Sequence, residues 1–119
     1  FTQIDVKNKL FQDLSASSLY DGIWACSSIL HLPLNDLILV MKKIESALKN
    51  TGVLYTSFKY GDYSGERNGR YFTDMTEDRF DEILQHCPSL HIIEIWQTGD
   101  VRQDRENEKW LNILLRKIN

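Results

Sequence analysis

The chain has 119 residues, of which 42% are hydrophobic, a size that allows one modest core and no second independent domain. Its 14 basic and 17 acidic residues are dispersed along the sequence and give a formal net charge of -3. We therefore expect no nucleic-acid partner and no membrane-bound surface, because both need a concentrated basic patch. The apolar runs are also too short to span a bilayer, so the sequence predicts a soluble protein.

The cysteines and histidines are not spaced as metal ligands. Cys26 and Cys87 lie in separate apolar patterns, so we expect each to be a buried thiol rather than half of a disulfide. His31, His86 and His91 show no H-x-x-x-H pair and no companion C-x-x-C. The sequence therefore predicts no metal site.

The first half of the chain predicts a strand, a helix and a further strand. A short strand is expected at residues 6–11, and the apolar run at 23–26 predicts a strand that is covered on both faces. A helix starts after Pro33, and it ends near residues 50–52, where Asn or Gly can take the left-handed conformation. Residues 53–58 form the next strand.

This order places two loops at one edge of the predicted sheet. Strands joined by a crossover helix run parallel, so the segments that follow them lie on the same side. Residues 26–28 and 59–61 are those segments. Because ligands bind at this edge in open α/β sheets, they are the first candidates for function.

The second half predicts a loop, a helix and a pair of strands. Residues 61–75 are polar and glycine-rich and are expected to form a mobile loop. Thr76 caps a helix that Pro88 stops. The apolar face of this helix comprises Phe80, Ile83, Leu84 and Cys87. Strands are expected at 90–96 and 110–115, paired antiparallel across an exposed polar loop.

Five stretches resemble class I S-adenosylmethionine-dependent methyltransferases. Residues 20–32 (YDGIWACSSILHL) resemble the fourth strand of that superfamily, and residues 47–54 (ALKNTGVL) its turn from a helix into the fifth strand. Residues 57–61 (SFKYG), 69–73 (GRYFT) and 108–112 (EKWLN) look like a bacterial subgroup labelled methyltransferase-domain or tellurite-resistance-like. The resemblance implies an α/β, partial Rossmann-like fold, with parallel strands followed by a C-terminal antiparallel β-hairpin.

By this resemblance, residues 1–119 are one domain that corresponds to the C-terminal half of a methyltransferase. The family's first two strands, with the glycine-rich loop and the acidic residue that hold the cofactor, have no counterpart here. Phe1 is not an initiator methionine and no signal-peptide pattern follows it, which indicates a cut start. We expect a cytoplasmic small-molecule methyltransferase that uses S-adenosylmethionine, with this chain alone incomplete for cofactor binding and inactive.

The resemblance also implies a set of cofactor-binding residues. They are Gln12, Asp13, Leu14, Ala25, Cys26 and Ser27. Asp13 would accept a hydrogen bond from the adenine amino group, unless it is an ordinary turn aspartate. The last three end the fourth strand, where small residues let the sulfonium part of the cofactor pass close to the backbone; tight helix packing explains small residues equally well.

A second implied set binds the methyl acceptor. It comprises His31, Lys59, Tyr60, Arg70 and Tyr71. Arg70 suits an anionic acceptor, unless it is an ordinary exposed arginine. His31 would touch substrate or act as a base, unless it braces the loop before the helix. No catalytic residue is predicted, because methyl transfer to a nucleophilic acceptor proceeds by positioning. The tryptophans are expected to pack in the core or at its edge, namely Trp24, Trp96 and Trp110.

The missing strands also bear on partners. Without them the edge of the fourth strand is bare, unless the third strand pairs with it, and bare edges invite pairing with another chain. We therefore expect a homodimer, or an N-terminal half supplied by the same or another chain. The alternative is a non-catalytic interaction module, or half of a split enzyme, derived from the methyltransferase fold.

Overall fold

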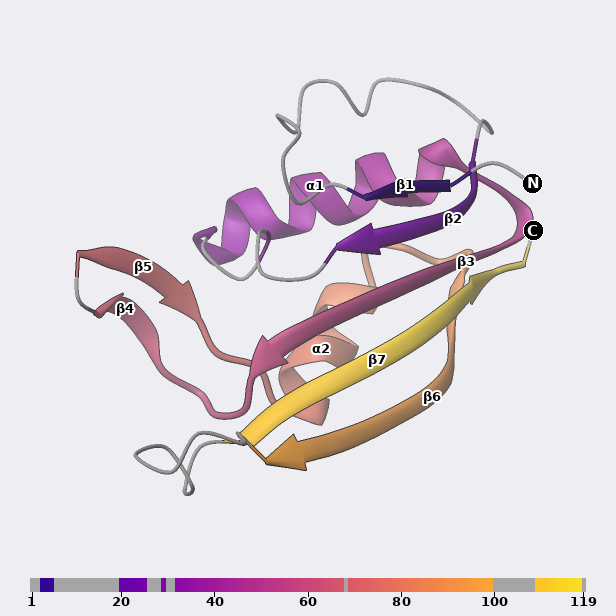
Figure 1. The fold of residues 1–119 in the computed structure, drawn as a ribbon. Helices are drawn as coiled ribbons and strands as arrows, with labels where there is room; N and C mark the ends of the chain where they lie inside the picture. The colour runs from indigo at the N-terminus through magenta and orange to yellow at the C-terminus, as the bar shows by residue number, and fades with distance from the viewer. Residues whose placement is uncertain are drawn as a thin grey trace.

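The structure, a computed structural model, describes residues 3–5, 20–25, 29, 32–67, 69–99 and 109–118. In chain order its elements are β1 (Gln3–Asp5), β2 (Tyr20–Ala25), α1 (Leu34–Ala47), β3 (Leu48–Lys59), β4 (Ser64–Arg67), β5 (Arg70–Thr73), α2 (Glu77–Leu84), β6 (Leu90–Gly99) and β7 (Lys109–Lys117). The described strands form a five-stranded sheet of order β1-β2-β3-β7-β6 and a hairpin of β4 and β5, which we call the arm. Figure 1 shows the arm extending from the sheet, far from both chain ends.

The sheet is parallel on one side and antiparallel on the other. β1, β2 and β3 run parallel. β7 lies antiparallel between β3 and β6, and it pairs with both. The α/β class and the antiparallel pairing predicted for the last two strands are confirmed. These strands could be predicted because their apolar residues alternate between the core and the opposite side.

The first described strand is β1, near the start of the chain. The strand expected at residues 6–11 falls outside the described residues, whereas β1 is Gln3–Asp5. Its residues pair in parallel with residues 22–24 of β2. Of the two alternatives for the edge of β2, the upstream strand therefore pairs with it over this length.

Helix α1 begins and packs as its sequence predicts. The carbonyl of Pro33 accepts the amide of Leu37 at 2.9 Å, so the helix starts directly after the proline. Its buried side chains recur every three or four residues; they are Leu37, Val40, Met41, Ile44 and Ala47. This spacing turns one side of the helix toward the core.

The end of α1 differs from the prediction, because the helix ends at Ala47 and not near residues 50–52. The left-handed residue is Thr51, which lies inside β3 with a φ of 69°, and not Asn50 or Gly52. A Cβ atom at Gly52 would lie 2.8 Å from the Lys49 carbonyl oxygen and 3.1 Å from the Tyr20 carbonyl oxygen. Position 52 therefore needs glycine for close backbone packing, and the strained conformation falls on its neighbour.

Helix α2 has the predicted cap. The Thr76 hydroxyl oxygen accepts the backbone N–H of Arg79 at 3.2 Å, which satisfies one free donor of the first turn. Phe80 and Ile83 are buried on the core side of the helix. The polar first turn and apolar second turn thus fix both the start and the orientation of α2.

Cys87, just past α2, confirms the prediction of a buried free thiol. Burial, reinforced by the negative charge of Glu45, raises the pKa of the Cys87 thiol to about 12. The thiol therefore stays protonated and unreactive at neutral pH. The same prediction for Cys26 falls outside the described residues.

The segment expected to be a mobile loop contains the arm, so that prediction was wrong. β4 and β5 pair antiparallel, with Arg67 opposite Arg70 beside the turn. Gly69 in this turn has a φ of +80°, a conformation that favours glycine. Ser64, Glu66 and Arg70 of the arm are exposed, and the residues of β4 are polar or glycine, so the arm lacks the apolar alternation that reveals a half-buried strand.

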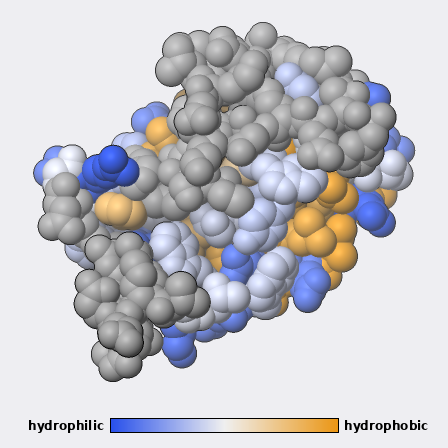
Figure 2. All heavy atoms as spheres, in the orientation of Figure 1, coloured by the Kyte–Doolittle hydropathy of each residue, from blue (hydrophilic) through white to orange (hydrophobic). Residues whose placement is uncertain are grey.

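Alternation along the strands gives the sheet two different faces. Leu54 and Leu115 pair on the face that α1 and α2 cover, which we call the helix face. Tyr55 and Leu114 pair on the other side, the opposite face. Figure 2 views this opposite face, where pale and blue side chains lie over the middle and an orange patch lies toward the chain ends.

Candidate functional site

Three strands of the sheet bring their ends to one edge, which we call the rim. β2 ends there at Ala25 and β3 at Lys59, and antiparallel β7 begins there at Lys109. The arm leaves the sheet from the same edge (Figure 1). The carboxyl ends of β2 and β3 therefore meet where α/β folds bind ligands, as the sequence predicts.

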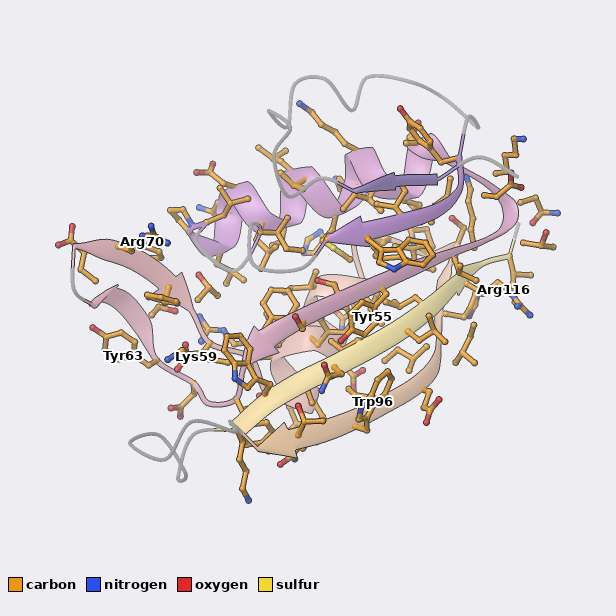
Figure 3. The ribbon with its side chains drawn as sticks, in the orientation of Figure 1. Tyr55, Lys59, Tyr63, Arg70, Trp96 and Arg116 are labelled. Carbon is orange, nitrogen blue, oxygen red and sulfur yellow. The ribbon has the colours of Figure 1, made fainter. Side chains whose placement is uncertain are left out.

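Lys59 lies at the centre of the described part of the rim. It pairs across the sheet with Trp110 of β7. Its Nζ lies 5.8 Å from the ring centroid of Trp110 and 5.5 Å from that of Phe72 in the arm. Both distances are within the range of a cation–π contact, so the ammonium is held by two aromatic rings. Figure 3 shows Lys59 at the base of the arm.

Tyr60, the next residue, belongs to a different contact. Its hydroxyl donates to Glu77 Oε1 at 3.0 Å, and Gln97 Nε2 donates to Glu77 Oε2 at 3.3 Å. The Glu77 carboxylate accepts hydrogen bonds from its own backbone N–H and from the Tyr60 hydroxyl. These hydrogen bonds, in that order of importance, hold the pKa of the Glu77 carboxyl below its usual range. The hydrogen bond to Glu77 raises the pKa of Tyr60. Tyr60 thus joins the rim to α2 and β6 and does not face Lys59.

The base of the arm is tied to both helices. The Arg79 guanidinium on α2 donates to the Asp62 carbonyl oxygen at 3.1 Å and also to Ser64 Oγ. On the other strand, Thr73 Oγ1 donates to the Leu32 carbonyl oxygen at 2.5 Å, just before α1. These contacts fix where the arm leaves the sheet.

One of the two predicted acceptor residues on the arm, Arg70, lies away from Lys59. Arg70 is exposed and pairs with Arg67 beside the turn. Figure 3 places Arg70 near the far end of the arm, while Lys59 lies at its base. Tyr71 is half-buried and pairs with Glu66. The structure therefore does not gather the four described acceptor candidates into one cluster.

Among the predicted cofactor residues, the structure describes only Ala25. Its side chain is fully buried, and its carbonyl oxygen accepts the Thr56 hydroxyl at 2.9 Å. The end of β2 is thus fixed to β3 by a hydrogen bond, and Ala25 itself adds only a methyl group. The remaining candidates, and one acceptor candidate, fall outside the described residues: Gln12, Asp13, Leu14, Cys26, Ser27 and His31.

Two side chains of the rim were not predicted as site residues. Trp110 was expected to pack at an edge, and Phe72 was not singled out, yet both contact the ammonium of Lys59. The motifs GRYFT and EKWLN contain these two aromatics, so the resemblance marked the segments but not the side chains. Only their spatial meeting with Lys59 identifies them.

Two absences hold for the described part of the chain. No helix there is both long and apolar enough to cross a membrane. In the same part of the chain, no group of three or more histidine, cysteine, aspartate or glutamate side chains is placed to hold a metal ion.

Solved structures of methyltransferases are similar to this chain. One is the 1,6-didemethyltoxoflavin-N1-methyltransferase of Burkholderia thailandensis, with a TM-score of 0.75 and 17% identity over 92% of this chain and 48% of that one. A methyltransferase of Methanosarcina mazei has a TM-score of 0.69 and 14% identity, over 87% of this chain and 61% of that one. The N-methyltransferase NodS of Bradyrhizobium japonicum has a TM-score of 0.65 and 15% identity, over 93% of this chain and 53% of that one. No protein-family model and no curated protein matches the chain.

These likenesses establish the fold. All three structures are methyltransferases, and two of them contain S-adenosylhomocysteine. The chain spans 48% of the first structure and 61% of the second, so it matches roughly half to three fifths of a methyltransferase. It has the α/β fold of S-adenosylmethionine-dependent methyltransferases.

Proposed function

We propose that this chain is part of an S-adenosylmethionine-dependent methyltransferase that acts on a small molecule. The observation that carries the proposal is the fold, shared at a TM-score of 0.75 with an enzyme of this class over 92% of the chain. The rim supports it, because the strand ends that meet there are where such a sheet binds ligands. Fold alone does not specify function, so the side chains at the rim must also suit the chemistry.

The end of β2 fits the passage of a cofactor. Ala25 contributes only a buried methyl group there, and its carbonyl oxygen already accepts the Thr56 hydroxyl, so this residue itself does not obstruct the strand end. S-adenosylmethionine supplies an activated methyl group bound to a sulfonium sulfur. The chain's own residues then need only to bind the acceptor and hold it in line with that methyl group.

The described residues account for the acceptor side more than for the cofactor side. Lys59 supplies a positive charge, and the arm supplies a wall beside the strand ends. The predicted adenine residue Asp13 and its neighbours fall outside the described part. We therefore propose that the chain provides the acceptor half, with much of the cofactor grip coming from an N-terminal half.

Several finer predictions remain part of this proposal. They are the bacterial tellurite-resistance-like subgroup, the cytoplasmic location, and a homodimer or a separately supplied N-terminal half. The alternative of a non-catalytic interaction module, or of half of a split enzyme, also remains a proposal.

A nuclear magnetic resonance titration of the 119-residue chain tests the proposal. S-adenosylhomocysteine, added to the 15N-labelled chain, is expected to bind with a dissociation constant of about 1 mM, because only part of the cofactor's contacts are present. The amides of Ala25 and Thr56 should shift, since both lie where β2 meets β3 at the rim.

The His91 and Arg116 amides lie at the other end of the sheet and serve as internal controls. Homocysteine alone should produce no shift at Ala25, because it lacks the adenosine group. Saturable shifts at the control amides, or an unchanged spectrum at about 5 mM ligand, would contradict the proposed function.

A further inference from the structure

The ammonium of Lys59 contacts two aromatic rings, so the rim offers a ligand more than a single positive charge. The ammonium lies near Phe72 of β5 and Trp110 of β7, so three separate elements contribute to one cluster, which we call the lysine clamp. All three side chains are half-buried. Their positions along the chain are 59, 72 and 110, and they meet only because the arm lies beside the sheet.

The two rings hold the ammonium in place. A ring face attracts a cation through its quadrupole, which restricts a flexible side chain to a few rotamers. The arm that carries Phe72 is fixed at its base, because Arg79 donates to the carbonyl oxygen of Asp62, just before β4, and Thr73, at the end of β5, donates to the carbonyl oxygen of Leu32. The clamp is therefore preorganised, which lowers the entropy that a ligand loses on binding.

The chemistry of the clamp selects a kind of ligand. A half-buried ammonium attracts an anion more strongly than an exposed one, because less water screens it. The rings add flat apolar surface, which favours a planar group over a small inorganic ion. A ligand that uses both features carries a negative charge beside an aromatic or conjugated ring.

We propose that Lys59, Phe72 and Trp110 bind the methyl acceptor, and that this acceptor is a planar ring bearing a carboxylate or similar anionic group. This inference rests on the proposed methyltransferase function. The anionic group pairs with Lys59 Nζ, and the ring lies against the aromatic side chains. A different ring substituent takes the methyl group: its lone pair forms the bond to carbon, the carbon–sulfur bond breaks, and sulfur keeps that electron pair. A proton on the nucleophile, where present, passes to water.

Binding of defined probes to the 119-residue chain tests the proposal without any cofactor. The probes are 2-naphthoate, its neutral analogue 2-naphthamide, the non-planar anion cyclohexanecarboxylate and inorganic phosphate. We expect 2-naphthoate to bind about tenfold more tightly than each of the others, since only it matches both charge and shape. Lys59 and Trp110 amides should shift in the nuclear magnetic resonance spectrum.

Variants separate the roles within the clamp. Lys59→Met should weaken 2-naphthoate about tenfold and leave 2-naphthamide unchanged, whereas Lys59→Arg should stay within about threefold of the wild type. Phe72→Leu keeps apolar volume but removes the flat ring, so it should reduce the preference for 2-naphthoate over cyclohexanecarboxylate. Lys43→Met, an exposed lysine of α1, is the matched control and should change nothing.

The outcomes are distinguishable from a failure of the proposed function. Equal binding of 2-naphthoate and 2-naphthamide, or unchanged binding in folded Lys59→Met, would overturn the acceptor class. If Lys59→Met does not fold, the proposal is judged from two other variants. Lys59→Arg should still bind 2-naphthoate more tightly than 2-naphthamide, and Phe72→Leu should lose the preference for 2-naphthoate over cyclohexanecarboxylate. Failure of either result contradicts the proposal. The S-adenosylhomocysteine titration is read at Ala25 and is independent of these probes.

Discussion

The helix face and the opposite face of the sheet are built from the same strands but differ in what they hold. On the helix face, Phe58 of β3 and Phe80 of α2 are fully buried, with ring centroids 6.2 Å apart. On the opposite face, the Tyr55 hydroxyl donates to Asn112 Oδ1 at 2.6 Å, and Asn112 Nδ2 donates to Thr98 Oγ1 at 3.1 Å. One face is held by apolar packing and the other by directional hydrogen bonds.

This difference separates stability from recognition within single strands. Phe58 and Lys59 are neighbours in β3, yet they point to opposite faces because strand side chains alternate. Phe58 packs in the core, whereas Lys59 reaches the aromatic rings at the rim. A substitution on the helix face should therefore cost stability, while one in the lysine clamp should cost binding.

The largest effect is expected on the helix face. Phe80→Ala removes a fully buried ring beside Phe58 and should lower the free energy of unfolding by about 3–5 kcal/mol. Leu39→Ala is the control, since Leu39 is 59% exposed on α1, and it should change stability by less than about 0.5 kcal/mol. Urea unfolding measures both; equal losses would show that α2 does not anchor the core.

A smaller effect is expected in the hydrogen-bonded network of the opposite face. Asn112 is 6% exposed, so Asn112→Ala leaves Tyr55 and Thr98 without this partner and should cost about 1–3 kcal/mol. Adding Tyr55→Phe to it should cost less than the two single losses combined, with a coupling of about 1 kcal/mol. Strictly additive losses in urea unfolding would show that the Tyr55 hydrogen bond contributes nothing.

The smallest expected effect is a loss of stability with rising pH, caused by the thiol of Cys87 in the core. Burial raises the pKa of Cys87 to about 12, while an unfolded thiol titrates near about 8.5. Between these values the unfolded chain binds fewer protons, so stability falls as pH rises, by at most about 1.4 kcal/mol per pH unit. Below about pH 8 the thiol is protonated in both states and the contribution is constant.

Urea unfolding at pH 8.5 and 9.5 in a Cys26→Ala background measures this loss, for which we expect about 1 kcal/mol. Cys87→Ala should remove the loss of stability caused by the Cys87 thiol and leave the pH dependence that arises from other groups. An identical slope in both proteins would mean that the Cys87 thiol is accessible to water in the folded state.

The predictions that held came from patterns that repeat along a helix or strand. The apolar spacing of α1 and the threonine cap of α2 identified both helices, because each signal lies within a few turns of one segment. The arm was missed because its exposed strands carry no apolar period, and its position depends on Arg79, which follows in the next helix. The left-handed conformation was not assigned to Thr51, because the space at Gly52 is limited not only by the nearby Lys49 carbonyl but also by that of Tyr20, far earlier in the chain.

The sequence by itself determined the two helices, the antiparallel pairing of the last two strands, the buried thiol at Cys87 and the edge at which the strand ends meet. It also marked Lys59 as a candidate, through a resemblance that covered segments rather than side chains. Only the tertiary structure inserted β7 between β3 and β6 and folded the arm beside the rim. It thereby placed Phe72 and Trp110 around Lys59, because contacts between residues far apart in the chain depend on packing that no local pattern encodes.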